Sequence, residues 1–348
     1  MTQSNRQTAV TFDDVSIVFG DAPETALPLM DKGQTRSEIQ TKTDQILGVH
    51  NCRLTVSEGE ILVLMGLSGS GKSTLLRAVN GLNPVVRGSV SVNDGGEMVN
   101  VTNADADTLR QIRLERVAMV FQQFGLFPWR SVEENVGLGL ELAGVDKETY
   151  TSQVAKYIDM VGLSDWAGRK VGELSGGMQQ RVGLARAFAT EAPILLMDEP
   201  FSALDPLIRT RLQDELLDLQ KSLGRTIIFV SHDLDEAFKL GDRIAIMEGG
   251  RIVQCGTPKE IYSNPSNEYV ADFVAHMNPL NVLIAGDMVE PVDAETQGEV
   301  DESTTLNAVM EHLSAQSSPM AVTRNGKVIG QVSQASVMAK LVDPREEN

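Results

Sequence analysis

The sequence predicts an α/β fold whose core is a mostly parallel sheet, with antiparallel β additions, a helical subdomain and a small α+β module at the C-terminal end. Short apolar runs, typical of strands buried on both faces, alternate with segments of helical periodicity, and one run leads directly into a glycine-rich loop. The composition changes after about Asn281, where acidic residues outnumber basic ones. We therefore expect one domain over residues 1–280 and a second over residues 281–348.

The first part of the chain predicts two kinds of strand. Residues 10–19 alternate in polarity and are rich in β-branched side chains, which favours a half-buried strand. Residues 60–65 are almost continuously apolar, which favours a parallel strand buried on both faces, and residues 73–79 predict a helix after the glycine-rich loop. Residues 22–44 are polar with a weak helical pattern, so they look like an insertion between the first two strands.

The middle of the chain continues the alternation. Residues 87–101 are rich in valine around a glycine turn, which predicts an antiparallel hairpin, and residues 131–166 read as mostly helical. Residues 193–197 and 225–230 predict two more buried strands, and residues 243–254 predict a second hairpin. One face of a helix between these strands is marked by Ile208, Leu212, Leu216, Leu219 and Leu223.

The C-terminal segment has a pattern of its own. Residues 306–313 predict a helix, residues 320–323 and 327–332 predict two strands joined by an Asn325-Gly326 turn, and residues 334–341 predict a closing helix. A regulatory module and a plain structural extension fit this pattern equally well.

Bulk composition excludes several functions. The formal net charge of −18 argues against a nucleic-acid binder, which needs clustered Lys and Arg, and against loose adsorption to an anionic membrane. Cys52 and Cys255 are the only cysteines and lie outside any metal-type cluster, so we expect free thiols in a reducing compartment. No run of about 18 apolar residues occurs, so another subunit would have to supply any membrane-spanning helices.

The glycine-rich loop matches the G-x-x-x-x-G-K-[ST] phosphate-binding pattern. Its glycines let backbone N–H groups wrap an anion at a helix N-terminus, where the helix dipole favours negative charge. We expect Lys72 to reach the β- and γ-phosphates of a nucleotide and Ser73 to ligate Mg²⁺. A chance turn is disfavoured because a strand precedes the loop and a helix follows it. The predicted binding residues are Gly66, Ser68, Gly69, Ser70, Gly71, Lys72, Ser73 and Thr74.

Two acidic residues follow the second buried strand. Asp198 and Glu199 stand at its carboxyl end, where open α/β sheets place their ligand sites. We expect Asp198 to hold Mg²⁺ through water and Glu199 to polarise an attacking water. Taken alone, the pair could also be a simple turn before Pro200.

A second possible anion cradle lies further along the chain. Ser175, Gly176 and Gly177 precede a helical run, so their N–H groups could bind a phosphate, although Ser175 could equally be an ordinary helix N-cap. A nucleotide needs one cradle, so a second one makes sense if it serves the nucleotide held by a partner copy.

Gln122 and His232 each follow a predicted strand. Gln122 offers an oxygen to Mg²⁺ or a hydrogen bond to the lytic water, and His232 could contact the γ-phosphate. A lone histidine is more often structural, but its position at a strand end favours the functional interpretation. Along the chain the five elements are the phosphate loop, Gln122, the Ser175-Gly176-Gly177 element, the Asp198-Glu199 pair and His232. This order describes a site that binds ATP between two copies of the chain and hydrolyses it.

With these residues together, residues 1–280 resemble the ATPase subunits of ATP-binding-cassette (ABC) transporters. The resemblance implies a P-loop NTPase fold in which residues 66–74 are the Walker A loop and residues 194–199 are Walker B, with Glu199 as the catalytic base. It also implies that Gln122 is the Q-loop glutamine, residues 174–180 the signature motif, Asp205 part of the D-loop, and His232 the switch histidine. Phe19 fits the aromatic residue that stacks on adenine. Met178 departs from the usual glutamine, and Gln179 would take over its polar contact.

The same resemblance implies the partners. Two copies would close head to tail around two ATP molecules with Mg²⁺, on the cytoplasmic face of the plasma membrane. Integral-membrane permease subunits would dock near residues 122–136, and an extracytoplasmic substrate-binding protein would act indirectly.

Finer features look like those of glycine betaine/proline/choline importers. They are the insertion after Phe19, the Phe127-Pro128-Trp129 segment and residues 231–237, while residues 271–282 look most like the choline branch. Another small-solute importer, for an amino acid or similar compound, stays the alternative. The tail resembles a single cystathionine-β-synthase-type (CBS) module.

Overall fold

The computed structural model describes residues 6–275, 280, 282–293, 295–315 and 318–342. The chain divides into two compact units, the first formed by residues 1–232 with 245–252 and the second by residues 233–244 with 253–348. In these described ranges, no helix is both long enough and apolar enough to span a bilayer. Residues 276–279 and 281, within the segment that looks most like the choline branch, lie outside the described residues.

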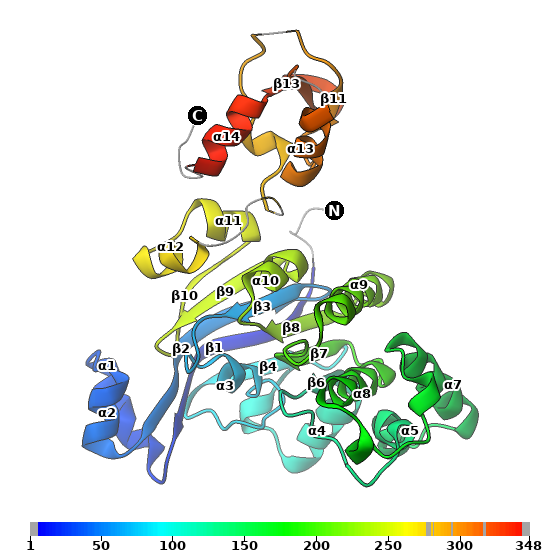
Figure 1. Cartoon of the computed structure of the whole chain (residues 1–348). Helices are drawn as coiled ribbons and strands as arrows, with labels where there is room; N and C mark the ends of the chain where they lie inside the picture. The colour runs from blue at the N-terminus through cyan, green and yellow to red at the C-terminus, as the bar shows by residue number, and fades with distance from the viewer. Residues whose placement is uncertain (1–5, 276–279, 281, 294, 316–317, 343–348) are drawn as a thin grey trace. The chain divides into compact units, whose positions relative to one another are not determined.

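The central sheet has the strand order β10-β9-β3-β8-β7-β6 (Figure 1). Strands β3, β8, β7 and β6 pair in parallel, with Ile61 opposite Ile227 and Asp198 opposite Val230. Every residue of β3, β7 and β8 is buried, which explains their apolar sequence. The strands are β3 (Ile61–Met65), β6 (Val117–Val120), β7 (Ile194–Asp198), β8 (Thr226–Val230), β9 (Arg243–Glu248) and β10 (Arg251–Gly256).

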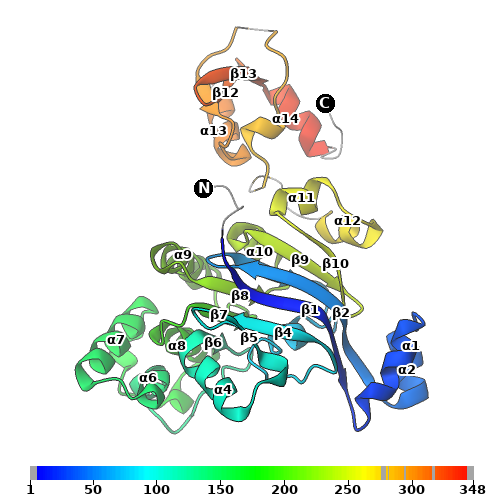
Figure 2. The ribbon, with the colours of Figure 1, turned by 180° about the vertical axis from the view of Figure 1, so that it is seen from behind.

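A second sheet is antiparallel and has the order β2-β1-β4-β5 (Figure 2). Its strands are β1 (Thr8–Phe19), β2 (Ile46–Ser57), β4 (Arg87–Asn93) and β5 (Met98–Asn100). The predicted hairpin over residues 87–101 is confirmed as β4 and β5. Phe19, the last residue of β1, pairs with Ile46 at the start of β2, so the whole insertion projects from this end of the strand pair.

The insertion folds as three short helices, η2 (Pro23–Ala26), α1 (Leu27–Asp31) and α2 (Arg36–Thr43). Thr35 and Glu38 form a capping box at the start of α2, which satisfies its first N–H groups. A small apolar cluster then holds the helices against β1 and β2; its buried members are Val18, Ala26, Met30, Ile39 and Leu47. The insertion is therefore a packed part of the first unit, and its predicted helical character is confirmed.

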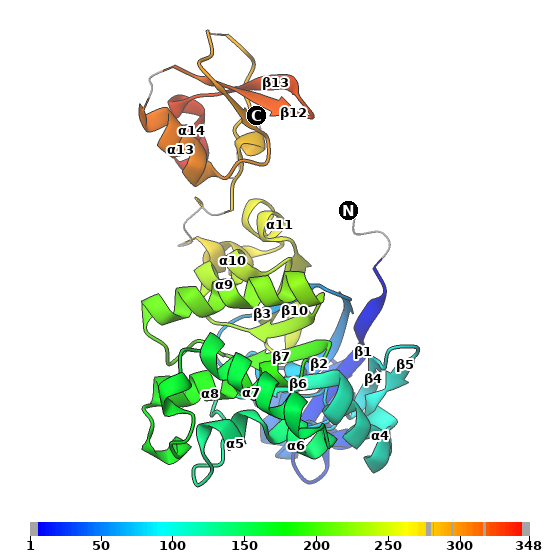
Figure 3. The ribbon, with the colours of Figure 1, turned by 90° about the vertical axis from the view of Figure 1, so that its right-hand side faces the viewer.

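Helices α5 to α8 gather in one part of the first unit, while α9 runs along the central sheet (Figure 3). Leu212, Leu216 and Leu219 of α9 are buried as predicted, but Leu223 is 45% exposed because the helix ends there before Gly224. The helix after the phosphate loop, α3 (Lys72–Leu76), is shorter than the predicted residues 73–79. The other helices are η3 (Val101–Asn103), α4 (Ala106–Gln111), η4 (Ile112–Arg116), α5 (Val132–Val136), α6 (Leu138–Ala143), α7 (Lys147–Met160), η5 (Ser164–Trp166), η6 (Val171–Glu173), α8 (Gly176–Ala189) and α9 (Pro206–Leu223).

The second unit contains a three-stranded sheet of order β11-β12-β13, in which β11 is parallel to β12 and β12 is antiparallel to β13. The predicted helix–strand–strand–helix order is confirmed, whereas β11 was not predicted because its three residues carry no periodicity. The elements are α10 (Leu234–Leu240), α11 (Pro258–Ser263), α12 (Glu268–Val274), η8 (Ala285–Asp287), β11 (Glu299–Asp301), α13 (Leu306–Ala315), β12 (Met320–Arg324), β13 (Lys327–Val332) and α14 (Gln334–Val342).

One buried side chain fixes the loop that precedes α5. Asn135 is fully buried and accepts a hydrogen bond from the Phe127 N–H at 2.9 Å. Its Nδ2 donates to the carbonyls of Phe127 at 3.0 Å and Ser131 at 2.9 Å. One amide side chain thereby closes both ends of the loop, as a backbone turn would.

We predict that Asn135→Ala lowers the free energy of unfolding by about 2 kcal/mol, because it leaves the Phe127 N–H without its partner and removes the hydrogen bonds from Nδ2 to the Phe127 and Ser131 carbonyls. Urea denaturation of the purified chain measures this. Trp129→Ala in the same loop is the matched control, since Trp129 is 66% exposed, and should change stability by less than about 1 kcal/mol. Equal stability of the two variants would show that Asn135 does not hold the loop.

Candidate active site

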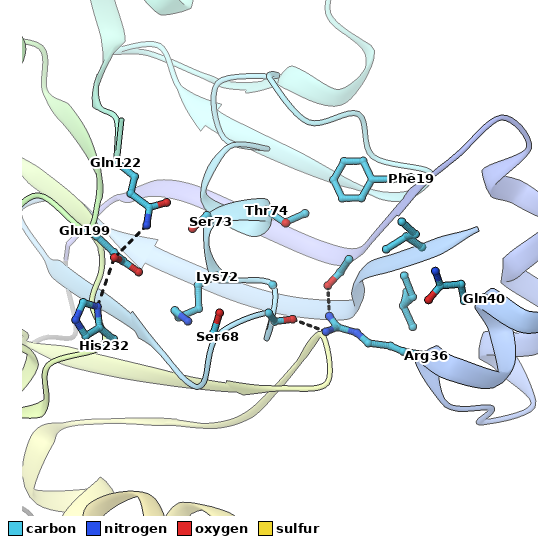
Figure 4. Close-up of a pocket in the computed structure, with 15 residues that line it drawn as sticks. Phe19, Arg36, Gln40, Ser68, Lys72, Ser73, Thr74, Gln122, Glu199 and His232 are labelled. Atoms are coloured by element: carbon cyan, nitrogen blue, oxygen red, sulfur yellow. Dashed lines mark hydrogen bonds and ion pairs between the residues drawn. The ribbon is translucent and has the colours of Figure 1, made fainter. Parts of the chain in front are cut away.

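A cavity of about 640 Å³ in the first unit brings the phosphate loop together with the ends of the strands (Figure 4). Ten of the predicted site residues line it: Phe19, Ser68, Gly69, Gly71, Lys72, Ser73, Thr74, Gln122, Glu199 and His232. Five other residues complete the lining: Arg36, Gln40, Ile46, Leu47 and Gly48. Gly66 and Ser70 shape the loop without lining the cavity.

The phosphate loop has the backbone that only glycine allows. Gly66 and Gly71 have φ values of 138° and 103°. A Cβ at Gly66 would lie 2.1 Å from the Met247 carbonyl oxygen, and one at Gly71 would lie 2.6 Å from the Gly48 carbonyl oxygen. The pattern G-x-x-x-x-G is therefore a steric requirement of this loop.

Lys72 is buried at the base of the loop, with 6% of its surface exposed. Its Nζ donates to the carbonyls of Gly66 at 2.8 Å and Leu67 at 3.0 Å. Desolvation lowers the pKa of Lys72, and the nearby carboxylates of Glu199 and Asp198 oppose that shift. An ammonium group, a hydroxyl and the N–H groups at the start of α3 fit a polyphosphate anion.

Asp198 is completely buried at the end of β7 and has two partners. Its Oδ1 accepts a hydrogen bond from the Ser73 hydroxyl at 2.6 Å, and its Oδ2 forms an ion pair with Arg77 at 2.8 Å. Ser73 and Asp198, two of the three residues predicted to hold Mg²⁺, therefore lie in direct contact. Their oxygens, together with that of Gln122, are the ligands that Mg²⁺ prefers.

Side chains that follow three neighbouring strands converge at Glu199. Gln122 Nε2 donates to Glu199 Oε2 at 3.2 Å, and His232 Nδ1 lies 3.4 Å from the same oxygen (Figure 4). The parallel register of β6, β7 and β8 explains this convergence, because Gln122, Glu199 and His232 follow neighbouring strands. Glu199 has a left-handed φ of 50°, unusual for a non-glycine residue. The group can position and deprotonate a water beside the phosphate loop.

The other end of the cavity is apolar. Phe19 is 36% exposed there, close to Ile46 and Thr74 (Figure 4). A Cβ at Gly48 would lie 2.9 Å from the Phe19 ring and 3.1 Å from the Thr74 side chain, so a glycine is needed for this approach. A flat, partly exposed ring at this end suits the predicted stacking on adenine.

The second predicted cradle does not line this cavity. Ser175 is the N-cap of α8 and accepts a hydrogen bond from the Met178 N–H at 3.4 Å, which confirms the N-cap interpretation. Gly176 and Gly177 follow in the first turn, and Gln179 donates to two backbone carbonyls of its own loop at 3.3 and 3.0 Å. Asp205 caps α9. Contact of these residues with a nucleotide stays a prediction.

Three residues that connect elements around the site were not predicted to do so from the sequence. Gln180 is buried, donates to the Glu199 carbonyl at 3.2 Å and accepts from the Ala203 N–H at 2.9 Å, so it joins α8 to the strand end. Arg77 lies four residues after Ser73 on one helical face, a spacing that could have identified it. Arg36 is one of three basic residues in a polar insertion, and no pattern distinguishes it from the others.

The chain is similar in sequence to known transport proteins. Residues 49–202 match the family model described as ABC transporter. The glycine betaine transport ATP-binding protein OpuAA of Bacillus subtilis is 44% identical over 95% of this chain and 77% of its own length. The glycine betaine/proline betaine transport system ATP-binding protein ProV of Escherichia coli is 48% identical over 78% of this chain and 67% of its own.

A solved structure of an ATP-binding cassette resembles this chain. A dimeric ATP-binding cassette in a post-hydrolysis state, bound to ADP and Pi, superposes with a TM-score of 0.62. It is 30% identical and covers 72% of this chain and 98% of its own. The chain therefore belongs to the ABC transporter family of ATP-hydrolysing subunits, in the group that includes the OpuAA and ProV proteins.

Proposed function

We propose that this ABC ATPase powers the import of a quaternary ammonium compound. The observation that carries the enzymatic part is the convergence of Gln122, Glu199 and His232 beside the phosphate loop. The similarity to OpuAA over 95% of the chain supports the transported class. The proposed reaction is hydrolysis of ATP to ADP and phosphate, coupled to movement of the solute.

Binding of the nucleotide would use the loop and its lysine. Backbone N–H groups of Gly69 and of residues 71–74 would surround the β-phosphate, and the Lys72 ammonium would neutralise charge on the β- and γ-phosphates. Ser73, Asp198 and Gln122 would hold Mg²⁺, which neutralises phosphate charge when bound. Phe19 would stack on the adenine ring at the apolar end.

Hydrolysis would depend on the group around Glu199. The Glu199 carboxylate accepts a proton from the attacking water, while Gln122 and His232, both within 3.4 Å of Glu199 Oε2, orient that carboxylate and the water. His232 has 63% of its side chain exposed, so it can also reach a γ-phosphate in the open cavity. Positioning and charge stabilisation are the main sources of rate in phosphoryl transfer to water.

A homodimer would complete each site. Ser175, Gly176 and Gly177 lie outside their own chain's cavity, so a nucleotide on a second copy is the ligand that they would serve. The similar ATP-binding cassette bound to ADP and Pi is itself dimeric, which supports this arrangement. Asp205 and Gln179 would lie near the same interface.

The permease would dock on the loop after Gln122. Trp129 is 66% exposed and its ring lies beside that of Phe127, with centroids 5.3 Å apart and planes tilted by 54°, so it is not a core residue. Exposed aromatic residues often anchor interfaces. We propose the cytoplasmic face of the bacterial plasma membrane as the location, with an extracytoplasmic binding protein presenting the solute to the permease.

Glycine betaine, proline betaine and choline are the proposed solutes, choline on the resemblance of residues 271–282. Recognition of a quaternary ammonium needs an aromatic cage, and we assign that cage to the binding protein. Another small-solute importer is the second candidate, because an ATPase subunit does not contact the solute.

The C-terminal module stays a separate proposal. We propose a boundary near residue 280 and a single CBS-like module over residues 281–348. The order α13, β12, β13, α14 supports it.

We predict that Glu199→Gln keeps ATP binding and lowers kcat by about a hundredfold or more, because the amide cannot accept the proton of the attacking water. Phosphate release and ATP-binding titrations measure the two effects, and gel filtration with ATP should show a trapped dimer. A kcat of Glu199→Gln near that of the unaltered chain would show that Glu199 is not the catalytic base.

A mixing experiment tests whether sites are shared between copies. Lys72→Ala and Ser175→Arg chains should each be inactive alone, because every composite site contains a lesion. When mixed, each heterodimer has one intact site, so part of the ATPase activity should return. Full activity of either variant alone would rule out composite sites.

Uptake of labelled solutes tests the transported class. Cells lacking this subunit should lose import of glycine betaine, choline or both, and the intact gene should restore it. The Glu199→Gln gene is the matched control and should not restore uptake. Unchanged uptake of both compounds with loss of an amino acid would favour the second candidate and leave the ATPase assignment intact.

A further inference from the structure

Two polar side chains of the insertion line the nucleotide cavity. Arg36 and Gln40 lie four residues apart on α2, so they share one face of the helix (Figure 4). Ile39 faces the apolar cluster and is fully buried, which fixes the rotation of α2. The face that reaches the cavity is therefore set by packing.

Arg36 joins the insertion to the phosphate loop. Its Nη1 donates to the Gly69 carbonyl within the loop, and its Nη2 donates to the Gly48 carbonyl on β2 at 2.5 Å. The planar guanidinium holds two donors in a fixed fork, so it sets the distance between these carbonyls. The N–H of the same peptide group, on Ser70, donates to the Leu67 carbonyl at 3.1 Å, so Arg36 and Leu67 together hold both sides of this peptide and fix the course of the phosphate loop.

Gln40 lies at the nucleoside end of the cavity. Figure 4 shows its side chain on the Phe19 side of the site, remote from Lys72 and Glu199. An aromatic ring stacks on any base and therefore discriminates poorly between bases. A carboxamide, by contrast, can donate to a ring nitrogen of adenine and accept from its exocyclic amino group. Guanine offers the opposite pattern at the corresponding position, so selection of adenine requires the carboxamide to keep the orientation that matches adenine.

We propose that α2 is a working part of the nucleotide site, in which Arg36 positions the phosphate loop and Gln40 selects adenine. The proposal rests on the ATPase function of the chain. It gives the insertion a role in this chain's own chemistry, independent of the permease and of the solute.

The test uses Arg36→Ala, Arg36→Lys and Gln40→Ala in the full-length chain. Lys42→Ala is the matched control, because Lys42 lies on the same helix, contacts Gln34 at 2.9 Å and does not line the cavity. For each chain, KM and kcat are measured with ATP and with GTP. Inhibition by inorganic tripolyphosphate and the shift in Tm produced by ATP are measured alongside.

Arg36→Ala should raise KM for ATP about five- to thirtyfold, the factor expected when charge-assisted hydrogen bonds are lost, with a smaller effect on kcat. Tripolyphosphate inhibition should weaken in parallel, because the loop itself is altered. Arg36→Lys should recover part of the loss, since an ammonium can still donate to one carbonyl.

Gln40→Ala should lower the ratio of kcat/KM for ATP to that for GTP about tenfold, the factor of one base-specific contact. Inhibition by tripolyphosphate, which has no base, should stay at the value of the Lys42→Ala control. An unchanged ATP-to-GTP ratio would overturn the role of Gln40.

A KM for ATP in Arg36→Ala within twofold of the control would overturn the role of Arg36. If Arg36→Ala has a lower Tm than the control without nucleotide, the role of Arg36 is judged from Arg36→Lys instead. An ATP-induced Tm shift of Arg36→Lys equal to that of the control would then overturn the role of Arg36. Absence of ATP hydrolysis by the unaltered chain would instead contradict the ATPase function itself.

Discussion

Backbone hydrogen bonds pair β3 with β8, β8 with β7 and β7 with β6 in parallel, so the four strands end at one edge of the sheet. The reactive residues come from segments far apart in sequence, such as Gln122 and Glu199, which are 77 positions apart, yet their separations follow from this register. A slip of one residue in β7 would turn Asp198 away from Ser73 and move Glu199 from Gln122. Burial of every side chain in β3, β7 and β8 is what opposes such a slip.

Side-chain bridges then refine the geometry that the sheet provides. Arg77 and Ser73 hold the Asp198 carboxylate from two sides, and Gln180 ties the strand end to α8 and to the loop at Ala203. Arg36 performs the corresponding task on the outer side of the phosphate loop. Each of these contacts joins two different segments of the first unit, so together they fix the position of the strand end and of the phosphate loop.

The sequence predicted the central strands and the site because both depend on local chemistry. A continuous apolar run has one stable environment in an α/β protein, and the glycines of residues 66–71 follow from steric contacts with fixed backbone oxygens. The missed features depend on tertiary contacts. Arg36 gains its role only when the insertion packs on Val18 and Leu47, and β11 exists only because β12 offers it a partner. Leu223 belongs to the apolar face by spacing, but the helix ends before the sheet can cover it. The solute could not be derived from the residues of the site, because their chemistry is that of a nucleotide site.

The left-handed backbone of Glu199 has a consequence for how this protein can be altered. A non-glycine residue in that conformation costs about 1 kcal/mol relative to glycine, so a change to glycine, which also removes the carboxylate, is the substitution that would relieve this strain. Robustness and turnover are therefore opposed at this one position. A library screened only for heat resistance or for yield would tend to accumulate inactive chains, and thermostability alone is a poor guide when improved versions of this ATPase are sought.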